Sequence, residues 1–277
     1  PSTQPLFWRH ADLPYLELRL VLDGRKVTYA PHSHQQWSVG AILAGQSEFR
    51  CEDRLHYVEQ GTLVLMNPDQ VHACNPRQGS PWSYYMMHLD KDWLADFLLQ
   101  AGVRKDAVWF DTKVDTLTEA SLFESFVVLA QLLMSADHAA LEKAQKLTSY
   151  LASLFLQLDQ TSQKPEQLLA PNPLYLVADY LSEHCGEDRA IESISAEFGY
   201  SSGYLVRAFK RHFHMTPHAY RLNRRVQLGQ QALKQGKAIA AVAQTTGFSD
   251  QAHFQRVFKQ RVAATPDQYR RSGSKLK

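Results

Sequence analysis

The chain has 277 residues, enough for two domains that each bury a core. Its composition, 44% hydrophobic and 21% charged, is that of a globular protein and excludes a disordered or fibrous chain. No apolar run reaches the roughly 18 residues of a membrane span, and residues 1–10 lack the layout of a signal peptide. Three scattered cysteines argue against a disulfide framework. We therefore expect a cytoplasmic protein that does not bind membranes.

The net charge of +2 conceals two parts of opposite sign. Residues 172–277 hold sixteen Lys or Arg against eight Asp or Glu, a balance of +8. The preceding residues hold fourteen against twenty, a balance of −6. A basic part beside an acidic one predicts a polyanionic partner for the carboxy-terminal part.

Residues 13–89 have the pattern of a β-domain. Apolar and polar residues alternate in Leu16-Glu17-Leu18-Arg19-Leu20, and Leu63-Val64-Leu65-Met66 is apolar throughout. Turn signals such as Asp23-Gly24 and Asn67-Pro68 separate the runs. Many short strands with tight turns predict a small barrel or jelly roll.

Two histidine motifs lie within this β-domain: Pro31-His32-Ser33-His34 followed by Gly45, and then Gly61, Pro68, His72 and Asn75. They resemble the paired motifs of the cupin barrel, and the resemblance implies His32, His34 and His72 as possible metal ligands. Ser38 stands where the family places a glutamate. We expect no cofactor, and histidines that hydrogen-bond an organic ligand or stabilise the strand.

Aromatic residues gather in the same region, and Glu17 and Arg19 share one face of an early strand. An aromatic-walled cavity with a few polar groups binds small molecules, although each of these aromatics can equally be plain core. The predicted ligand-binding residues are Trp8, Glu17, Arg19, His32, His34, Trp37, Ser38, His72 and Trp82.

Residues 90–163 change to a helical period, with one apolar stripe at Leu122, Phe126, Leu129 and Leu133 and another from Leu141 to Leu158. We expect these helices to complete a domain over 1–163, with the barrel ending at about residue 89, and the last two helices to form a homodimer. Prolines and polar residues over 164–172 predict a linker.

Residues 173–277 contain one pattern twice, about fifty residues apart. Arg207-Ala208-Phe209-Lys210 and Thr216-Pro217 in the first copy correspond to Arg256-Val257-Phe258-Lys259 and Thr265-Pro266 in the second. In each copy a short apolar helix ends at a glycine, Gly199 or Gly247. Ser201 or Ser202, and then Ser249 or Asp250, cap the next helix. Each copy predicts a helix-turn-helix unit.

This duplicated stretch resembles the AraC/XylS family of bacterial transcription regulators, with His214 and Ala263 where the family usually has glycine. The resemblance implies two recognition helices about one DNA turn apart. Arginine pairs with guanine and glutamine with adenine, whereas lysine reaches phosphates. The implied DNA-binding residues are Ser202, Gly203, Val206, Arg207, Lys210, Gln251, Gln255, Arg256 and Lys259.

The sequence thus predicts an α+β chain of two domains, a cupin-like jelly roll with helices and an all-α DNA-binding domain. The leading hypothesis is a transcription regulator, controlled by a small-molecule effector, that activates through RNA polymerase. One alternative is a metal-binding cupin enzyme fused to a DNA-binding domain. Another is an effector-independent regulator that uses the barrel only for dimerisation. No catalytic triad, phosphate loop or carboxylate pair is legible, so we expect no enzyme.

Overall fold

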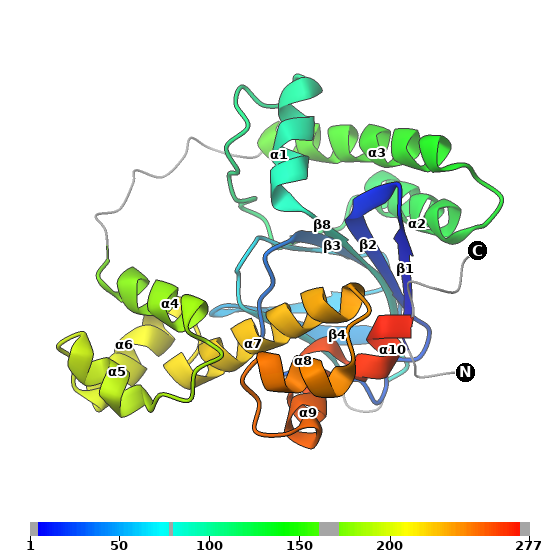
Figure 1. Cartoon of the computed structure of the whole chain (residues 1–277). Helices are drawn as coiled ribbons and strands as arrows, with labels where there is room; N and C mark the ends of the chain where they lie inside the picture. Colours follow the sequence, from blue (N-terminus) through cyan, green and yellow to red (C-terminus); the bar gives the residue numbers. More distant parts are fainter. Residues whose placement is uncertain (1–4, 78–79, 161–171, 272–277) are drawn as a thin grey trace. The chain divides into compact units, whose positions relative to one another are not determined.

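The computed structural model describes residues 5–77, 80–160 and 172–271 (Figure 1). The chain divides into two compact units. The first contains the strands and helices α1–α3, and the second contains α4–α10 together with Tyr29–His32. The predicted linker, 164–172, lies outside the described residues except for its last position.

The first unit is built from antiparallel strands in two sheets. The larger sheet has the order β1-β2-β8-β3-β6-β9 and the smaller β5-β4-β7. The β-structure begins before residue 13, where the sequence predicted its start, because Leu6–His10 forms a strand that pairs antiparallel with the next strand. The strands are β1 Leu6–His10, β2 Leu13–Val21, β3 Trp37–Ala44, β4 Gln46–Cys51, β5 Arg54–Glu59, β6 Leu63–Met66, β7 His72–Pro76, β8 Ser83–Leu89 and β9 Thr116–Leu117.

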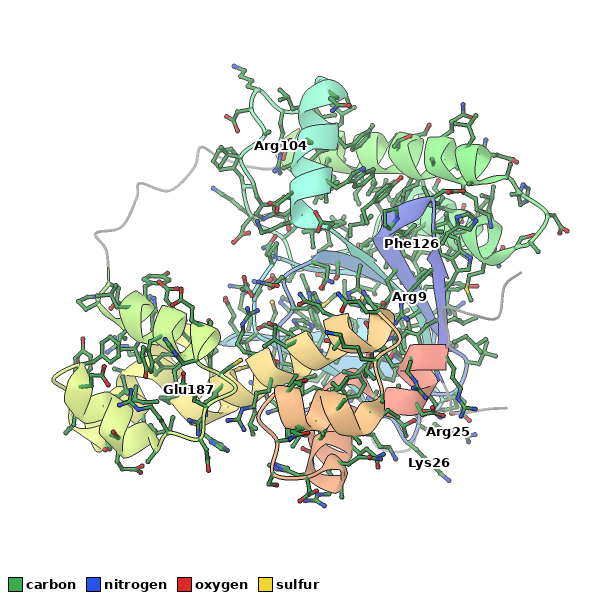
Figure 2. All side chains as sticks on the ribbon, in the orientation of Figure 1. Arg9, Arg25, Lys26, Arg104, Phe126 and Glu187 are labelled. Carbon is green, nitrogen blue, oxygen red and sulfur yellow. The ribbon has the colours of Figure 1, made fainter. Side chains whose placement is uncertain are left out.

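One face of the larger sheet packs against three helices, α1 Lys91–Gln100, α2 Ala120–Met134 and α3 Ala140–Gln160. Because side chains alternate along a strand, Leu16 and Leu18 of β2 join this core whereas Glu17 and Arg19 point to the other face. Phe126 of α2, labelled in Figure 2, is fully buried in it. The helical stripes predicted for residues 90–163 thus cover the sheet, except for Leu141 at the start of the second stripe, which is exposed.

The second unit is entirely helical, apart from its loops. Its helices are α4 Leu174–Glu183, α5 Ile191–Glu197, α6 Ser202–Phe213, α7 Pro217–Lys234, α8 Ile239–Thr245, α9 Gln251–Val262 and α10 Pro266–Arg271. The predicted fold class, a β-rich domain followed by a helical domain with two helix-turn-helix units, is confirmed. None of the described helices is long and apolar enough to cross a membrane.

Both helix-turn-helix turns depend on a glycine in the left-handed region, with φ of +74° at Gly199 and +80° at Gly247. The next helix begins with a side-chain cap in each copy. The Ser201 hydroxyl accepts from the Tyr204 amide, and the Asp250 carboxylate accepts from the His253 amide. The turn therefore has the same construction twice, in α5–α6 and in α8–α9.

The two positions where the family usually has glycine are also left-handed. His214 and Ala263 both have φ of 54°, directly after α6 and α9. A side chain costs about 1–2 kcal/mol in this conformation. The chain therefore keeps the helix-ending turn at both positions without glycine.

Replacing Ala263 by glycine is expected to raise the free energy of unfolding by about 1 kcal/mol, because glycine adopts a positive φ without steric cost. Denaturant unfolding followed by circular dichroism measures the change. Ala232→Gly inside α7 is the matched control, and it should lower stability by about 1 kcal/mol. The same sign for both variants would contradict the assignment of strain to residue 263.

Candidate functional site

The second recognition helix, α9, presents the predicted residues on one exposed face. Phe254 and Phe258 are fully buried on its inner side. On its outer side the polar side chains Gln251, Gln255, Arg256 and Lys259 are all exposed. This face therefore offers two amides and two cations to a partner in solution, as a reading helix requires.

The start of α9 is fixed by a small hydrogen-bond network. Asp250 Oδ1 accepts from the backbone amide of His253 at 2.7 Å, and Ser249 Oγ donates to Asp250 Oδ2 at 3.2 Å. The bond from the His253 amide is the largest cause of a lowered pKa at Asp250. The carboxylate therefore stays ionised, and it holds the turn from which Gln251 projects.

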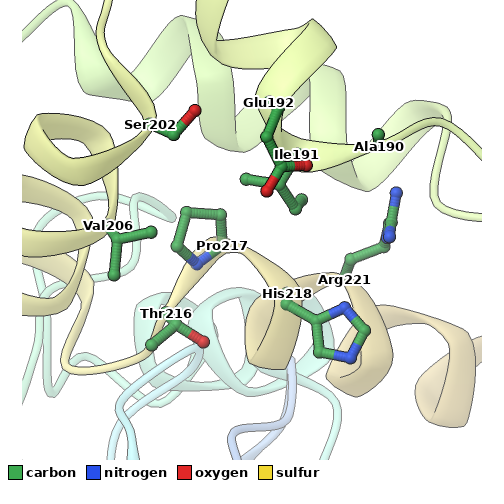
Figure 3. Close-up of a pocket in the computed structure, with 9 residues that line it drawn as sticks. All are labelled: Ala190, Ile191, Glu192, Ser202, Val206, Thr216, Pro217, His218 and Arg221. Carbon is green, nitrogen blue, oxygen red and sulfur yellow. The ribbon is translucent and has the colours of Figure 1, made fainter.

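The first recognition helix, α6, presents fewer polar groups. Gly203, Arg207 and Lys210 are exposed, but Ser202 and Val206 are half-buried. These last two line a pocket of about 490 Å³ with residues of α5 and α7, among them Pro217 and Arg221 (Figure 3). Ser202 and Val206 thus lie in the wall of this pocket and not on the most exposed side of α6.

The guanidinium group of Arg207 lies close to Gly203 on α6. A Cβ atom built on Gly203 would lie 3.3 Å from one terminal guanidinium nitrogen of Arg207, so this side chain folds back across the glycine. Tyr204, which is 51% exposed and stacks on Tyr200, lies beside them and was not among the predicted residues.

In the first unit, polar side chains form a row across the face of the larger sheet opposite its helices. Glu17 of β2 pairs with His88 of β8, which pairs in turn with Ser38 of β3. Paired residues share a face, so the three side chains point the same way. Ser38 Oγ lies 2.7 Å from His88 Nδ1, and Arg9 Nε of β1 donates to Glu17 Oε2 at 2.7 Å.

Arg19 lies two residues further along β2 on the same face. Its guanidinium carbon lies over the ring of Phe7, 4.7 Å from the ring centre. Glu17 and Arg19 are each only 6% exposed. The sequence identified these two charged residues but missed Arg9 and His88. Alternation along Phe7-Trp8-Arg9, and along Met86-Met87-His88, is the signal that places both on this face.

Two of the three histidines of the cupin motifs come together. The ring of His34 lies 4.8 Å from that of His72 and 4.9 Å from that of His88. Burial lowers the pKa of His72 to about 4, so the ring is neutral near pH 7. His32 instead belongs to the segment that groups with the second unit.

Over the described ranges, no group of three or more His, Cys, Asp or Glu side chains is placed to hold a metal ion. The enzyme alternative required His32, His34 and His72 as ligands, and it has no support from their arrangement.

The predicted tryptophans are placed differently from the polar row. Trp8 and Trp37 belong to the apolar core between the sheet and helices α1–α3, which is the alternative of plain core that the sequence left open for each aromatic. Trp82 is 2% exposed and stacks on Tyr84, and its carbonyl accepts from the Gly24 amide at 2.6 Å. Trp8 and Trp37 pack in the core because their strands turn them towards the helices, whereas Trp82 is buried in the loop just before β8.

Comparison with known proteins decides the family. The model of the AraC-like ligand binding domain matches residues 15–177, more than half of the chain. The chain belongs to the AraC family. A helix-turn-helix domain model matches residues 194–272, which contain both recognition helices of this AraC-family chain.

Relatives agree over most of the length. The uncharacterized HTH-type transcriptional regulator YbfI of Bacillus subtilis is 27% identical over 222 residues, 80% of each chain. LumQ of Photobacterium leiognathi, named a probable transcriptional regulator, is 26% identical over 252 residues, 90% of this chain and 93% of LumQ.

A solved structure of ToxT from Vibrio cholerae with an unsaturated fatty acid bound has a TM-score of 0.53 at 14% identity, covering 89% of this chain and 91% of ToxT. That likeness shows the fold. With the family established, this AraC-family chain is a transcriptional regulator that has a DNA-binding domain and a ligand-binding domain.

Proposed function

We propose that the chain is a sequence-specific transcription activator whose recognition helices α6 and α9 read two successive major-groove segments. The observation that carries the proposal is the outer face of α9, where two glutamines and an arginine stand exposed together. Gln251 and Gln255 suit adenine, and Arg256 suits guanine. Lys210 and Lys259 contact phosphates, which adds affinity without sequence information.

The two half-sites are read with unequal strictness. On α6 only Arg207 is both exposed and able to make a bidentate base contact, while Val206 and Ser202 lie in the pocket wall. The first half-site is therefore read through Arg207, shape and thymine methyl groups, and the second through a full set of hydrogen bonds.

Arg256→Ala and Arg207→Ala are each expected to weaken binding by about 1–3 kcal/mol and to relax specificity at one half-site. The reason is the loss of a bidentate base contact. Duplexes selected from a random pool, followed by titration of single-base variants, measure both effects. Lys259→Ala is the control, because losing a phosphate contact weakens all sequences alike. Uniform weakening by the arginine variants would show that they too contact only the backbone.

The effector site lies on the polar face of the first unit. Arg9, Glu17, Arg19, Ser38 and His88 are charged or polar side chains placed together on the side of the sheet away from the helices. Buried polar groups of this kind fix the orientation of a small polar ligand. His34 and His72 border this face through His88 and complete the proposed set.

A thermal-shift screen of the full chain tests the effector, with amino acids, sugars, aromatic acids and, because ToxT holds one, unsaturated fatty acids. A saturable hit that Glu17→Gln weakens supports the site. No saturable hit would favour a regulator that uses the first unit only as a scaffold.

A homodimer and contact with RNA polymerase complete the proposal. Helices α2 and α3 expose three large apolar side chains, with Val128 at 63%, Leu141 at 71% and Leu156 at 51%. Apolar groups on neighbouring helices support a dimer through them. Sedimentation velocity reports the mass of the assembly, and transcription in vitro with purified polymerase reports whether the chain activates or represses.

A further inference from the structure

Arg225, near the middle of α7, joins both halves of the second unit. Its side chain is 6% exposed. Its Nε donates to the carbonyl of Cys185 at 2.5 Å, and one terminal nitrogen donates to the carbonyl of Glu187 at 2.9 Å. The other terminal nitrogen donates to the carbonyl of Gly247. Glu187 is labelled in Figure 2.

These acceptors come from different halves. Cys185 and Glu187 lie in the loop between α4 and α5, before the first helix-turn-helix unit. Gly247 is the turn residue of the second unit. The planar guanidinium carries its donors in a fixed fork, so one rigid group can hold these carbonyls at fixed positions. A lysine has one nitrogen and does not span the same acceptors.

The loop and the turn also touch directly. A Cβ atom on Gly247 would lie 2.3 Å from the carbonyl oxygen of Gly186 and 2.8 Å from its Cα, a spacing that real atoms do not reach. Gly199, the matching turn glycine of the first unit, has nothing within 4 Å of such an atom. Both glycines need a positive φ, but only Gly247 also needs to lack a side chain for close backbone approach.

We propose that Arg225 and the Gly186–Gly247 contact lock the two helix-turn-helix units into one body and thereby set the half-site spacing that the domain accepts on DNA. Arg225 is thus a positioning residue that reads no base itself. When two modules are held in the right relative position, binding of the first gives the second a high effective concentration at its own half-site. This advantage is lost when the spacing of the half-sites does not match that of the modules. This inference rests on the proposed DNA-binding function for its consequence, but not for the lock itself.

The lock is tested first without DNA. Spin labels on Lys210→Cys and Lys259→Cys, one exposed position on each recognition helix, report the distance between α6 and α9 in the full chain. The native thiols, Cys51, Cys74 and Cys185, are buried, and burial raises the pKa of each, so labelling favours the introduced sites.

We expect a narrow distance distribution that broadens in Arg225→Lys. Arg224→Lys is the matched control, because the Arg224 terminal nitrogen bonds Gln227 within α7 itself, and its distribution should stay narrow. An unchanged width in Arg225→Lys would overturn the proposal.

The consequence is tested on DNA. Duplexes selected with the unaltered chain are lengthened between the half-sites in single-base-pair steps, up to about half a helical turn. The unaltered chain should lose about tenfold or more in affinity over the series, and Arg225→Lys should bind more weakly throughout with a clearly shallower loss. Gly247→Ala should behave like Arg225→Lys, whereas Gly199→Ala, which strains a turn without a clash, should keep the steep dependence.

The two failures are distinguishable. If no specific duplex is recovered with the unaltered chain, the proposed function fails and the spin-label distances still decide the lock. A steep spacing dependence retained by both Arg225→Lys and Gly247→Ala would refute the lock while leaving DNA binding intact. If Arg225→Lys does not fold, Gly247→Ala against Gly199→Ala carries the same comparison.

Discussion

Replacing Phe258 by alanine is expected to lower the free energy of unfolding of the second unit by about 3–5 kcal/mol. Phe258 is fully buried beneath α9, with its ring 5.4 Å from that of Phe254 and 5.6 Å from that of Tyr269. Alanine would leave a cavity at the contact between α9 and α10. Because the helix that carries Arg256 rests on this ring, specific DNA binding should fall with stability.

Circular dichroism during urea unfolding measures this loss, since the second unit is helical. Tyr204→Ala is the control, because it also removes a large ring from a recognition helix, but one that is 51% exposed. Its stability should change by no more than about 0.5 kcal/mol. Equal losses for the two variants would mean that the ring of Phe258 does not pack as described.

The construction of the second unit was predictable because its signals are local. Gly199 and Gly247 mark the turns, and capping candidates lie within three residues of each. The outward face of α9 followed from helical spacing, since Phe254 and Phe258 had to point inward. The lock at Arg225 was not predictable, because it joins carbonyls that are 38 and 40 residues away along the chain in one direction and 22 in the other.

In the first unit, the alternation of apolar and polar residues along the strands predicted which side chains share a face of the sheet. It did not predict which face packs against the helices. Glu17 and Arg19 were correctly placed on one side of β2. Trp37 and Ser38 are neighbours in sequence and so point to opposite faces, and the sequence alone does not say which face the helices cover. His88 lies beside both Glu17 and Ser38 because β8 pairs with β2 on one side and β3 on the other. The residues of one strand do not determine which strands it pairs with, so the sequence did not predict this contact.

Acidification from about pH 6.5 to pH 4 is expected to destabilise the first unit by about 3 kcal/mol through His72 alone. Burial lowers the pKa of His72 to about 4, below the ordinary value of 6.5. The unfolded chain therefore binds a proton throughout this window that the folded chain does not bind, so the free energy of unfolding falls with pH and levels off below it. All five tryptophans lie in the first unit, so tryptophan fluorescence during urea unfolding follows this transition separately. His72→Gln, which cannot titrate, should show a shallower dependence between these limits, and an identical slope for both proteins would refute the neutral buried state of His72.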